Sequence, residues 1–140
     1  MIEIDTDKAR LDVDVIHRFL QQSYWAAGVP RDVVERSIEH SLCFGVYVDG
    51  AQAGFARVIS DYATFAYLAD VFVLEGFRGQ GLSKRLMDTI VGHPRLQGLR
   101  RWSLATRDAH GLYAQFGFAP LGTPARYMER LDPGVYTSQT

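Results

Sequence analysis

Apolar residues in the first part of the chain change their spacing, and each spacing predicts a different element. Ile2 and Ile4 alternate with acidic residues, which predicts a short first strand. Apolar residues then recur every three to four positions over residues 11–20, which predicts an amphipathic helix. A glycine and a proline within residues 28–30 end this pattern, and a second short helix is predicted to end near Ser41.

The middle of the chain has the period of two that is typical of strands. Residues 42–48 alternate, and Asp49-Gly50 is a two-residue hairpin signal, so residues 51–60 are predicted to return as the antiparallel partner. Residues 65–73 are apolar at nearly every position, with Asp70 as their single charge. This run predicts a central strand that is covered on both faces.

The last part of the chain returns to the helical period and then to short strands. Residues 82–91 predict a helix that stops before a His-Pro pair, and a short strand follows around Trp102. A short helix over residues 109–116 is capped by a glycine, and two final strands are predicted at residues 118–121 and 125–131. The series predicts an α/β fold with a mixed sheet of about six to seven strands and about four helices.

Composition narrows the class of protein. The chain has 140 residues, of which 47% are hydrophobic and 22% charged, so one domain over residues 1–131 is expected, with a polar tail over residues 132–140. That tail is expected either to be disordered or to cross to the partner subunit of a homodimer. The formal net charge of −1 provides no overall basic field for nucleic acid or for an anionic membrane.

Targeting and metal signals are missing from the sequence. The acidic start does not resemble a signal peptide, and the longest apolar stretch is shorter than a membrane span. One cysteine, Cys43, forms neither an internal disulfide nor a zinc cage, and His17, His40 and His93 have no metal-ligand spacing. We therefore expect a cytoplasmic protein without a metal cofactor.

A glycine-rich turn joins the apolar strand at residues 65–73 to the helix at residues 82–91. The first N–H groups of a helix have no partner within it, and glycines at residues 79 and 81 let a ligand approach the backbone closely. This arrangement favours a phosphate, such as the pyrophosphate of a cofactor. Leu82 stands where a Walker A loop needs lysine, and Lys84 stands where a dinucleotide fingerprint needs glycine. A tight turn without a ligand is the alternative.

The segment Arg78-Gly79-Gln80-Gly81-Leu82-Ser83 resembles the acyl-CoA loop of the GNAT superfamily of N-acetyltransferases, with serine in place of the usual final glycine or alanine. A second segment, residues 109–118, resembles that family's short tyrosine-bearing helix with its aromatic-Gly-aromatic exit. The resemblance spans residues 42–130. It implies a GNAT-like fold and direct transfer of an acetyl group from acetyl-CoA to a primary amine, with no covalent intermediate. Cys43 is then not needed as a nucleophile.

The resemblance also implies how the co-substrate is held. The amides of residues 78–83 would bind the pyrophosphate, and the backbone near Val71 and Val73, with Phe72 between them, would pair with the pantetheine amides. The N–H of Val71 would stabilise the thioester oxygen, as in an oxyanion hole. Thr106 stands where many members have an asparagine that contacts the cofactor.

Two residues are candidates for moving protons. Tyr113 occupies the family's position for a general acid, and its ordinary pKa near 10 suits donation to a thiolate; a half-buried packing residue is the alternative. Asp70 is the candidate base for the acceptor ammonium, because it is the only charge in its strand; a structural carboxylate is the alternative. His110 is either a proton relay or a surface residue.

Aromatic residues in two loops are expected to wall the acceptor pocket. Tyr24 and Trp25 lie between the first two predicted helices, and Tyr62 lies in the turn before the central strand. They suit an aromatic or cationic amine, or they only cover the core. The leading hypothesis is an N-acetyltransferase for a small-molecule amine. The alternatives are a peptide or protein amine, or a catalytically silent acyl-CoA-binding module.

Overall fold

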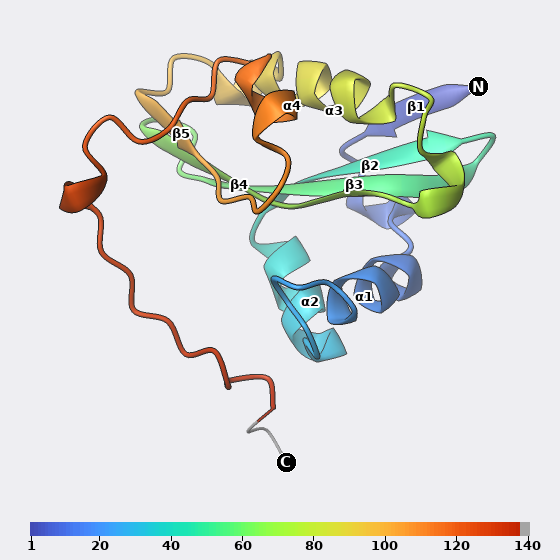
Figure 1. Ribbon diagram of the computed structural model, residues 1–140. Helices are drawn as coiled ribbons and strands as arrows, with labels where there is room; N and C mark the ends of the chain where they lie inside the picture. The colour runs from blue at the N-terminus through green and yellow to red at the C-terminus, as the bar shows by residue number, and fades with distance from the viewer. Residues whose placement is uncertain (138–140) are drawn as a thin grey trace.

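A five-stranded sheet in the order β1-β2-β3-β4-β5 lies between two helical layers (Figure 1). The computed structural model describes residues 1–137. Its strands are β1 (Ile2–Asp5), β2 (Leu42–Val48), β3 (Ala51–Ser60), β4 (Phe65–Val73) and β5 (Arg101–Ser103). Its α-helices are α1 (Val13–Gln21), α2 (Arg31–Glu39), α3 (Leu82–Val91) and α4 (His110–Ala114). The predicted α/β class and the four helices are confirmed.

Strand pairing follows from the connections. Strands β1 to β4 pair antiparallel with their neighbours, whereas β4 and β5 pair parallel because α3 crosses between them. At the hairpin between β2 and β3, Asp49 and Gly50 both have positive φ angles of 50° and 87°. Turns of this kind match the twist of paired strands, so the predicted hairpin is confirmed.

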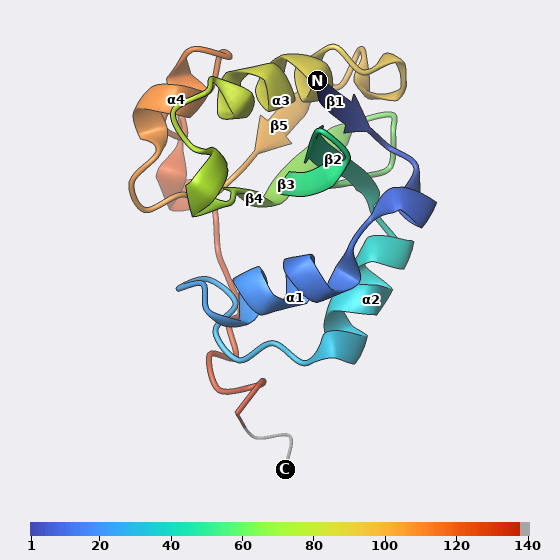
Figure 2. The same ribbon diagram turned by 90° about the vertical axis from the view of Figure 1, so that its right-hand side faces the viewer.

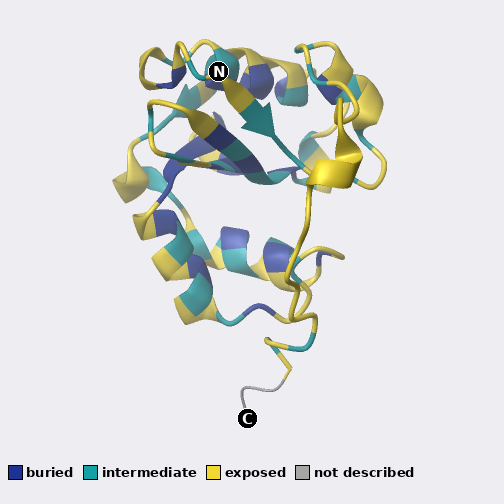
Figure 3. Cartoon of the chain, turned by 90° about the vertical axis from the view of Figure 1, so that its left-hand side faces the viewer, coloured by how far each residue is buried: buried dark blue, intermediate teal, exposed yellow. Residues whose placement is uncertain are grey.

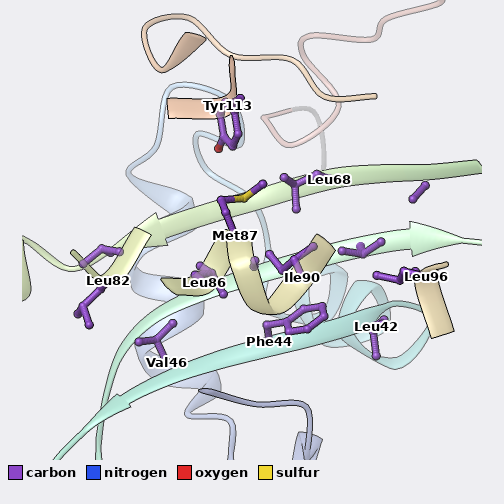
Figure 4. Packing of buried hydrophobic residues seen from close by; sticks show 14 of the residues in the cluster. Leu42, Phe44, Val46, Leu68, Leu82, Leu86, Met87, Ile90, Leu96 and Tyr113 are labelled. Atoms are coloured by element: carbon purple, nitrogen blue, oxygen red, sulfur yellow. The ribbon is translucent and has the colours of Figure 1, made fainter. Parts of the chain in front are cut away.

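Each face of the sheet buries its own apolar cluster. Helices α1 and α2 lie side by side beneath one face (Figure 2), where Phe55 and Phe72 meet Ile16 and Leu20. Helix α3 covers the other face, and Figure 4 shows its apolar side chains directed at β2 and β4. The largest fully buried residues of this second cluster are Phe44, Leu82, Leu86, Met87, Ile90, Leu96, Val46 and Val58.

Strand β4 is irregular where its charged residue lies. Arg57 faces Ala69 and Phe55 faces Phe72, so three steps along β4 match two along β3. The extra residue forms a β-bulge, and Asp70 within it has a φ of 55°, in the left-handed region that non-glycine residues rarely adopt. Strand β5 pairs only with the first three residues of β4. The bulged part of β4 is therefore free on its β5 side within the described chain.

The two final strands were wrongly predicted. Residues 118–121 and 125–131 form no strand, and residues 119–133 are all exposed. We call residues 119–137 the C-terminal arm; Figure 3 shows it as an exposed segment that runs along the outside of the molecule. A strand needs a neighbouring edge, and the three residues of β5 provide few backbone partners for a longer strand. The predicted tail begins within this arm, and its residues 138–140 lie outside the described residues.

Candidate functional site

The glycine-rich turn forms a hollow of about 320 Å³ at the end of β4. Gly79 and Gly81 have φ angles of 82° and 73°, and a Cβ atom at either residue would meet nothing within 4 Å. The hollow is lined by Val73, Phe77, Arg78, Gly79, Gly81, Leu82, Ser83, Lys84 and Leu112. At these two glycines the turn therefore presents its backbone, with no side chain in the way of a ligand.

The backbone donors of this turn have no partners in the described chain. Helix α3 starts after Gly81 without a side-chain cap, and no acceptor within residues 1–137 pairs with the N–H groups of residues 79–84. These donors lie where the helix dipole is positive, which favours an anionic group. The N–H of Arg78 is an exception to the predicted set, because it donates to the carbonyl of Glu75 at 3.2 Å.

The Arg78 side chain turns back onto β4. Its Nε donates to the carbonyl oxygen of Val73 at 3.1 Å. That carbonyl belongs to the part of β4 that has no β5 partner. The Arg78 side chain is thus hydrogen-bonded to the Val73 carbonyl, a backbone group that was expected to bind a ligand. A ligand that formed its own hydrogen bond to this carbonyl would displace the guanidinium.

A larger cavity of about 630 Å³ lies between the bulged part of β4, the loop after α1 and the segment before α4. It brings together most of the predicted site: Tyr24, Trp25, Asp70, Val71, Thr106 and Tyr113 all line it. Phe72 points to the opposite side of the strand from Val71, and its ring stacks on Phe19 with centroids 4.0 Å apart. Only the backbone of Phe72 is therefore available at this site.

Tyr113 is a protonated phenol at the wall of the cavity. Its side chain is 8% exposed, and Figure 4 shows its hydroxyl directed from α4 toward β4. That hydroxyl has no hydrogen-bond partner in the described chain and is not sealed from the cavity. Burial, with smaller contributions from Tyr24 and Asp108, raises the pKa of Tyr113 above its ordinary value. The group can donate a proton at neutral pH.

Asp70 is held by two side chains from other elements. Its Oδ2 accepts a hydrogen bond from Arg57 Nε at 2.9 Å, and its Oδ1 accepts one from Trp25 Nε1 at 2.8 Å. The Asp70 and Arg57 side chains are only 10% and 16% exposed, so the ion pair is largely buried. Arg57 also donates to the hydroxyl of Ser41 at 3.1 Å. The cavity thus contains a balanced pair of charges beside an aromatic wall.

The other predicted residues have clear positions. Thr106 Oγ1 accepts from the N–H of Ala109 at 3.1 Å, which fixes the start of α4. The Tyr24 hydroxyl accepts from the N–H of Arg107 at 3.0 Å, and the Arg107 guanidinium lies 3.9 Å from the centre of the Tyr24 ring. His110 is exposed.

Tyr62 is not brought to the cavity. Its ring packs against the cluster beneath α3, and the Arg95 guanidinium lies 3.9 Å from the ring centre. Tyr62 has a φ of 63°, in the left-handed region, and it forms part of the turn between β3 and β4. The cavity wall that Tyr62 was expected to form is instead made by residues that the sequence did not single out, Tyr67 and Tyr136.

Cys43 is not available as a nucleophile. It is 1% exposed on β2, and burial raises the pKa of its thiol to about 11. Within residues 1–137 no group of three or more His, Cys, Asp and Glu side chains is placed to hold a metal ion. No helix in the same part of the chain is long and apolar enough to cross a membrane.

Comparison with known proteins identifies the family to which the chain belongs. Residues 12–118 match the family described as the acetyltransferase (GNAT) family. A protein of Gibberella zeae that is provisionally named an acetyltransferase is 32% identical, with the alignment covering 80% of this chain and 75% of that protein.

Solved structures share the whole fold. A crystal structure of a provisionally assigned GNAT-family acetyltransferase from Xanthomonas campestris pv. campestris is 58% identical, covers 99% of this chain and 98% of its own, and has a TM-score of 0.96. A crystal structure of a provisionally assigned acetyltransferase from Clostridium acetobutylicum, solved with acetyl-CoA, has the same fold at 12% identity and a TM-score of 0.64, covering 94% of this chain and 96% of its own.

Proposed function

Because this chain belongs to the GNAT acetyltransferase family, it is an acyltransferase, and we propose that it moves an acetyl group from acetyl-CoA directly to a primary amine of a small molecule. The family uses acetyl-CoA as the acetyl donor. Each step of the proposed reaction can be assigned to groups of this chain that already lie at the two cavities.

The glycine-rich turn fits the diphosphate arm of coenzyme A. The free N–H groups of residues 79–83 supply hydrogen bonds, and the glycines leave room for the ligand to approach the backbone. Arg78 and Lys84 line the same hollow and would add positive charge. The free edge of β4 from Val71 to Val73 offers backbone groups to the pantetheine arm, and Thr106 lies at the cavity wall that this arm would pass.

The thioester would be polarised by the backbone of the bulge. The Val71 amide lies directly after Asp70, at the part of β4 that no neighbouring strand covers in the described chain. A backbone N–H in a cavity with little water stabilises the negative charge that develops on the carbonyl oxygen. This role of the Val71 amide would account for the bulge, the point at which β4 departs from regular strand geometry.

Proton movement would use Tyr113 and Asp70. The amine nitrogen attacks the carbonyl carbon, the carbon–sulfur bond breaks, the leaving thiolate takes the Tyr113 proton, and the nitrogen, positively charged after the attack, releases its second proton to solvent. The acceptor enters as an ammonium and must lose a proton before it attacks, which we assign to Asp70. Arg57 balances the Asp70 charge, and Trp25 fixes the carboxylate in place. Tyr113 recovers its proton from solvent after the products leave.

The size of the cavity supports a small acceptor. A volume of about 630 Å³ lies within the range of small-molecule sites. Tyr24 and Trp25 are close to perpendicular, with ring centroids 5.1 Å apart, and so provide both a ring face and a ring edge to the acceptor. An amine that carries an apolar or aromatic group suits these walls.

The observation that carries the proposal is that Tyr113, Asp70 and Val71 line one cavity, while the glycine turn lines a second hollow at the end of the same strand. The test is to measure free thiol release from acetyl-CoA over a panel of small amines, with a peptide amine panel in parallel. Turnover with a small amine, and an acetylated product identified by mass spectrometry, supports the proposal. Tight CoA binding with no thiol release on any acceptor would establish a silent binding module instead.

A further inference from the structure

The charged side chains that line the larger cavity form two pairs of opposite charge. Arg57 Nε donates to Asp70 Oδ2 at 2.9 Å, and Arg107 Nη2 lies 3.9 Å from Asp108 Oδ2. No other lysine, arginine, aspartate or glutamate of residues 1–137 lines this cavity. The cavity is therefore neutral as a whole, although it contains full charges of both signs.

The two pairs differ in how far water reaches them. The Arg57–Asp70 pair is largely buried, whereas the Arg107 and Asp108 side chains are 64% and 71% exposed. Water screens an exposed pair, so the outer pair contributes little to the binding of a ligand. Beside the inner pair, a ligand charge interacts strongly and an unbalanced charge is costly. The inner pair therefore decides which charges the acceptor can carry.

Both members of the inner pair can form more hydrogen bonds. Arg57 uses Nε on Asp70 and Nη1 on the Ser41 hydroxyl, and its Nη2 has no partner within residues 1–137. That nitrogen is open to the cavity, because Arg57 lines it and the Tyr47 hydroxyl is the only buried side-chain polar atom without a partner in the described chain. Each Asp70 oxygen accepts one hydrogen bond, from Arg57 or from Trp25, and can accept another.

The base role proposed for Asp70 leaves Arg57 without a counter-charge. When the Asp70 carboxylate takes a proton from the acceptor, the Arg57 guanidinium remains as a lone charge at a largely buried position. Such a charge is costly unless a second anion pairs with it. An acceptor that carries a carboxylate next to its amine brings that anion with it.

We propose that the acceptor is an α-amino acid with an apolar or aromatic side chain, an inference that rests on the acetyl transfer proposed above. Its ammonium lies at Asp70 and its carboxylate at Arg57 Nη2. In an α-amino acid both groups are attached to one carbon atom, which suits a site whose two charges are in direct contact. The amino acid adds no net charge to the cavity, whereas a simple amine adds an unbalanced positive charge.

The charges stay balanced through the reaction. The ammonium passes one proton to Asp70, and Arg57 then pairs with the acceptor carboxylate in place of Asp70. The attack on the thioester, the release of the thiol and the loss of the second proton follow as assigned above. The product is an N-acetyl amino acid, whose carboxylate still pairs with Arg57.

The other walls of the cavity suit the side chain of the acceptor. Trp25 Nε1 donates to Asp70 Oδ1, so aromatic surface begins next to the position of the ammonium. Tyr24, Tyr67 and Tyr136 line the same cavity. Apolar and aromatic side chains are stabilised by contact with such surfaces.

Matched compounds test the proposal on the unmodified protein. Phenylalanine, phenylalaninamide and phenethylamine share a ring and a primary amine, but only phenylalanine has a carboxylate. Its kcat/KM in thiol release should be at least about tenfold higher than that of either other compound, because they lack the charge-assisted hydrogen bond to Arg57. 3-Phenylpropionate, which has the carboxylate without the amine, should compete with phenylalanine. A kcat/KM for phenethylamine equal to or above that for phenylalanine would overturn the inference and leave the acetyl transfer standing.

Calorimetry with CoA present separates acceptor binding from turnover. Phenylalanine should bind the protein–CoA complex at least about tenfold more tightly than phenethylamine. That result without thiol release from any compound would support the amino-acid site and contradict the proposed acetyl transfer. Equal or weaker binding of phenylalanine would contradict the amino-acid site.

Two arginine variants test which pair binds the carboxylate. Lysine at residue 57 keeps a charge beside Asp70 but lacks the second nitrogen of the guanidinium, so Arg57→Lys should reduce the preference for phenylalanine over phenethylamine at least about fivefold. Arg107→Lys changes the exposed pair in the same way and should keep that preference within about twofold. Far-ultraviolet circular dichroism checks that both variants are folded, and the compounds on the unmodified protein decide alone if Arg57→Lys is not. A preference that is retained in Arg57→Lys contradicts the assignment.

Discussion

At the scale of single residues, the Tyr113 hydroxyl carries the clearest prediction. Tyr113→Phe should lower kcat by about 10²-fold, because a positioned general acid contributes about that factor, while the dissociation constant for CoA stays within about twofold. The rate of thiol release gives kcat, and calorimetry gives the dissociation constant for CoA. Tyr62→Phe removes an equivalent hydroxyl outside the cavity and should have no effect on either. Unchanged turnover in Tyr113→Phe would remove the residue from its proposed role.

The raised pKa of Tyr113 predicts the pH dependence of turnover. The phenol must be protonated to act, and burial moves its pKa above the ordinary value near 10. The loss of kcat that reports its ionisation therefore lies above pH 10, and kcat should not fall between about pH 7 and pH 9. A pH profile of kcat in the wild-type protein checks this; a decline below pH 9 that disappears in Tyr113→Phe would contradict it.

Variants of the Arg57–Asp70 ion pair can separate a structural role of Asp70 from a chemical one. Asp70→Asn leaves Arg57 without a counter-charge at a largely buried position and should lower the free energy of unfolding by about 3 kcal/mol. The double variant Asp70→Asn with Arg57→Gln should recover most of that stability but not the activity. Denaturant unfolding and thiol release give the two readouts. Recovery of activity along with stability would show that Asp70 acts only through the fold.

Cys43 allows direct acetyl transfer to be distinguished from transfer through a covalent intermediate on the enzyme. With a thiol pKa of about 11 and a buried side chain, it should resist iodoacetamide at pH 8 while the protein is folded. Cys43→Ala should keep kcat within about twofold, because direct transfer needs no nucleophile on the enzyme. Mass spectrometry of the alkylated protein and thiol release check both statements. Inactivation by alkylation would point to a covalent intermediate.

Single site residues could be predicted from the sequence where local spacing carries the chemistry. Tyr113 and the glycines of the turn were predicted from their neighbours in sequence, and they line the two cavities. Arg57 and Tyr136 were missed, because each reaches the cavity through a pairing between distant parts of the chain. For Arg57 one signal was present: it is the single charge in the central part of an otherwise buried strand, as Asp70 is in the next.

At the scale of elements, the turn between β4 and α3 depends on bare backbone. Gly81→Val should weaken CoA binding by at least about tenfold, because its side chain fills the approach to the free N–H groups and a β-branched residue disfavours a φ of 73°. Gly98→Val is the matched control, since Gly98 has a φ of 75° and equal open space in a distant loop. Both variants should lose similar stability, but only Gly81→Val should lose CoA affinity in calorimetry. Equal affinity in the two would contradict the loop assignment.

Elements with strong periodicity could be predicted and the final strands could not. The hairpin at Asp49-Gly50 and helix α3 follow from local signals, namely turn residues and a helical spacing of apolar positions. The bulge at Asp70 has no such signal, because it arises from a register difference between two strands. Residues 125–131 were predicted as a strand but pair with no strand of the described chain, and a sequence pattern alone does not specify the partner.

At the scale of the whole molecule, the expected homodimer would divide stability into a part within one chain and a part between copies. Leu86 and Leu131 test this division with the same residue type, since Leu86 is a fully buried residue of α3 and Leu131 is 69% exposed on the C-terminal arm. Leu86→Ala should lower the free energy of unfolding by about 2–5 kcal/mol at any protein concentration.

Leu131→Ser should behave differently, because the Leu131 side chain is 69% exposed in the described part of one copy. The unfolding temperature of the wild-type protein should rise with protein concentration as copies associate, and Leu131→Ser should remove that rise while matching wild type at high dilution. Thermal unfolding at about 1 μM and about 100 μM measures both effects. A Leu131→Ser variant that is destabilised equally at both concentrations would place the side chain in the fold of a single chain.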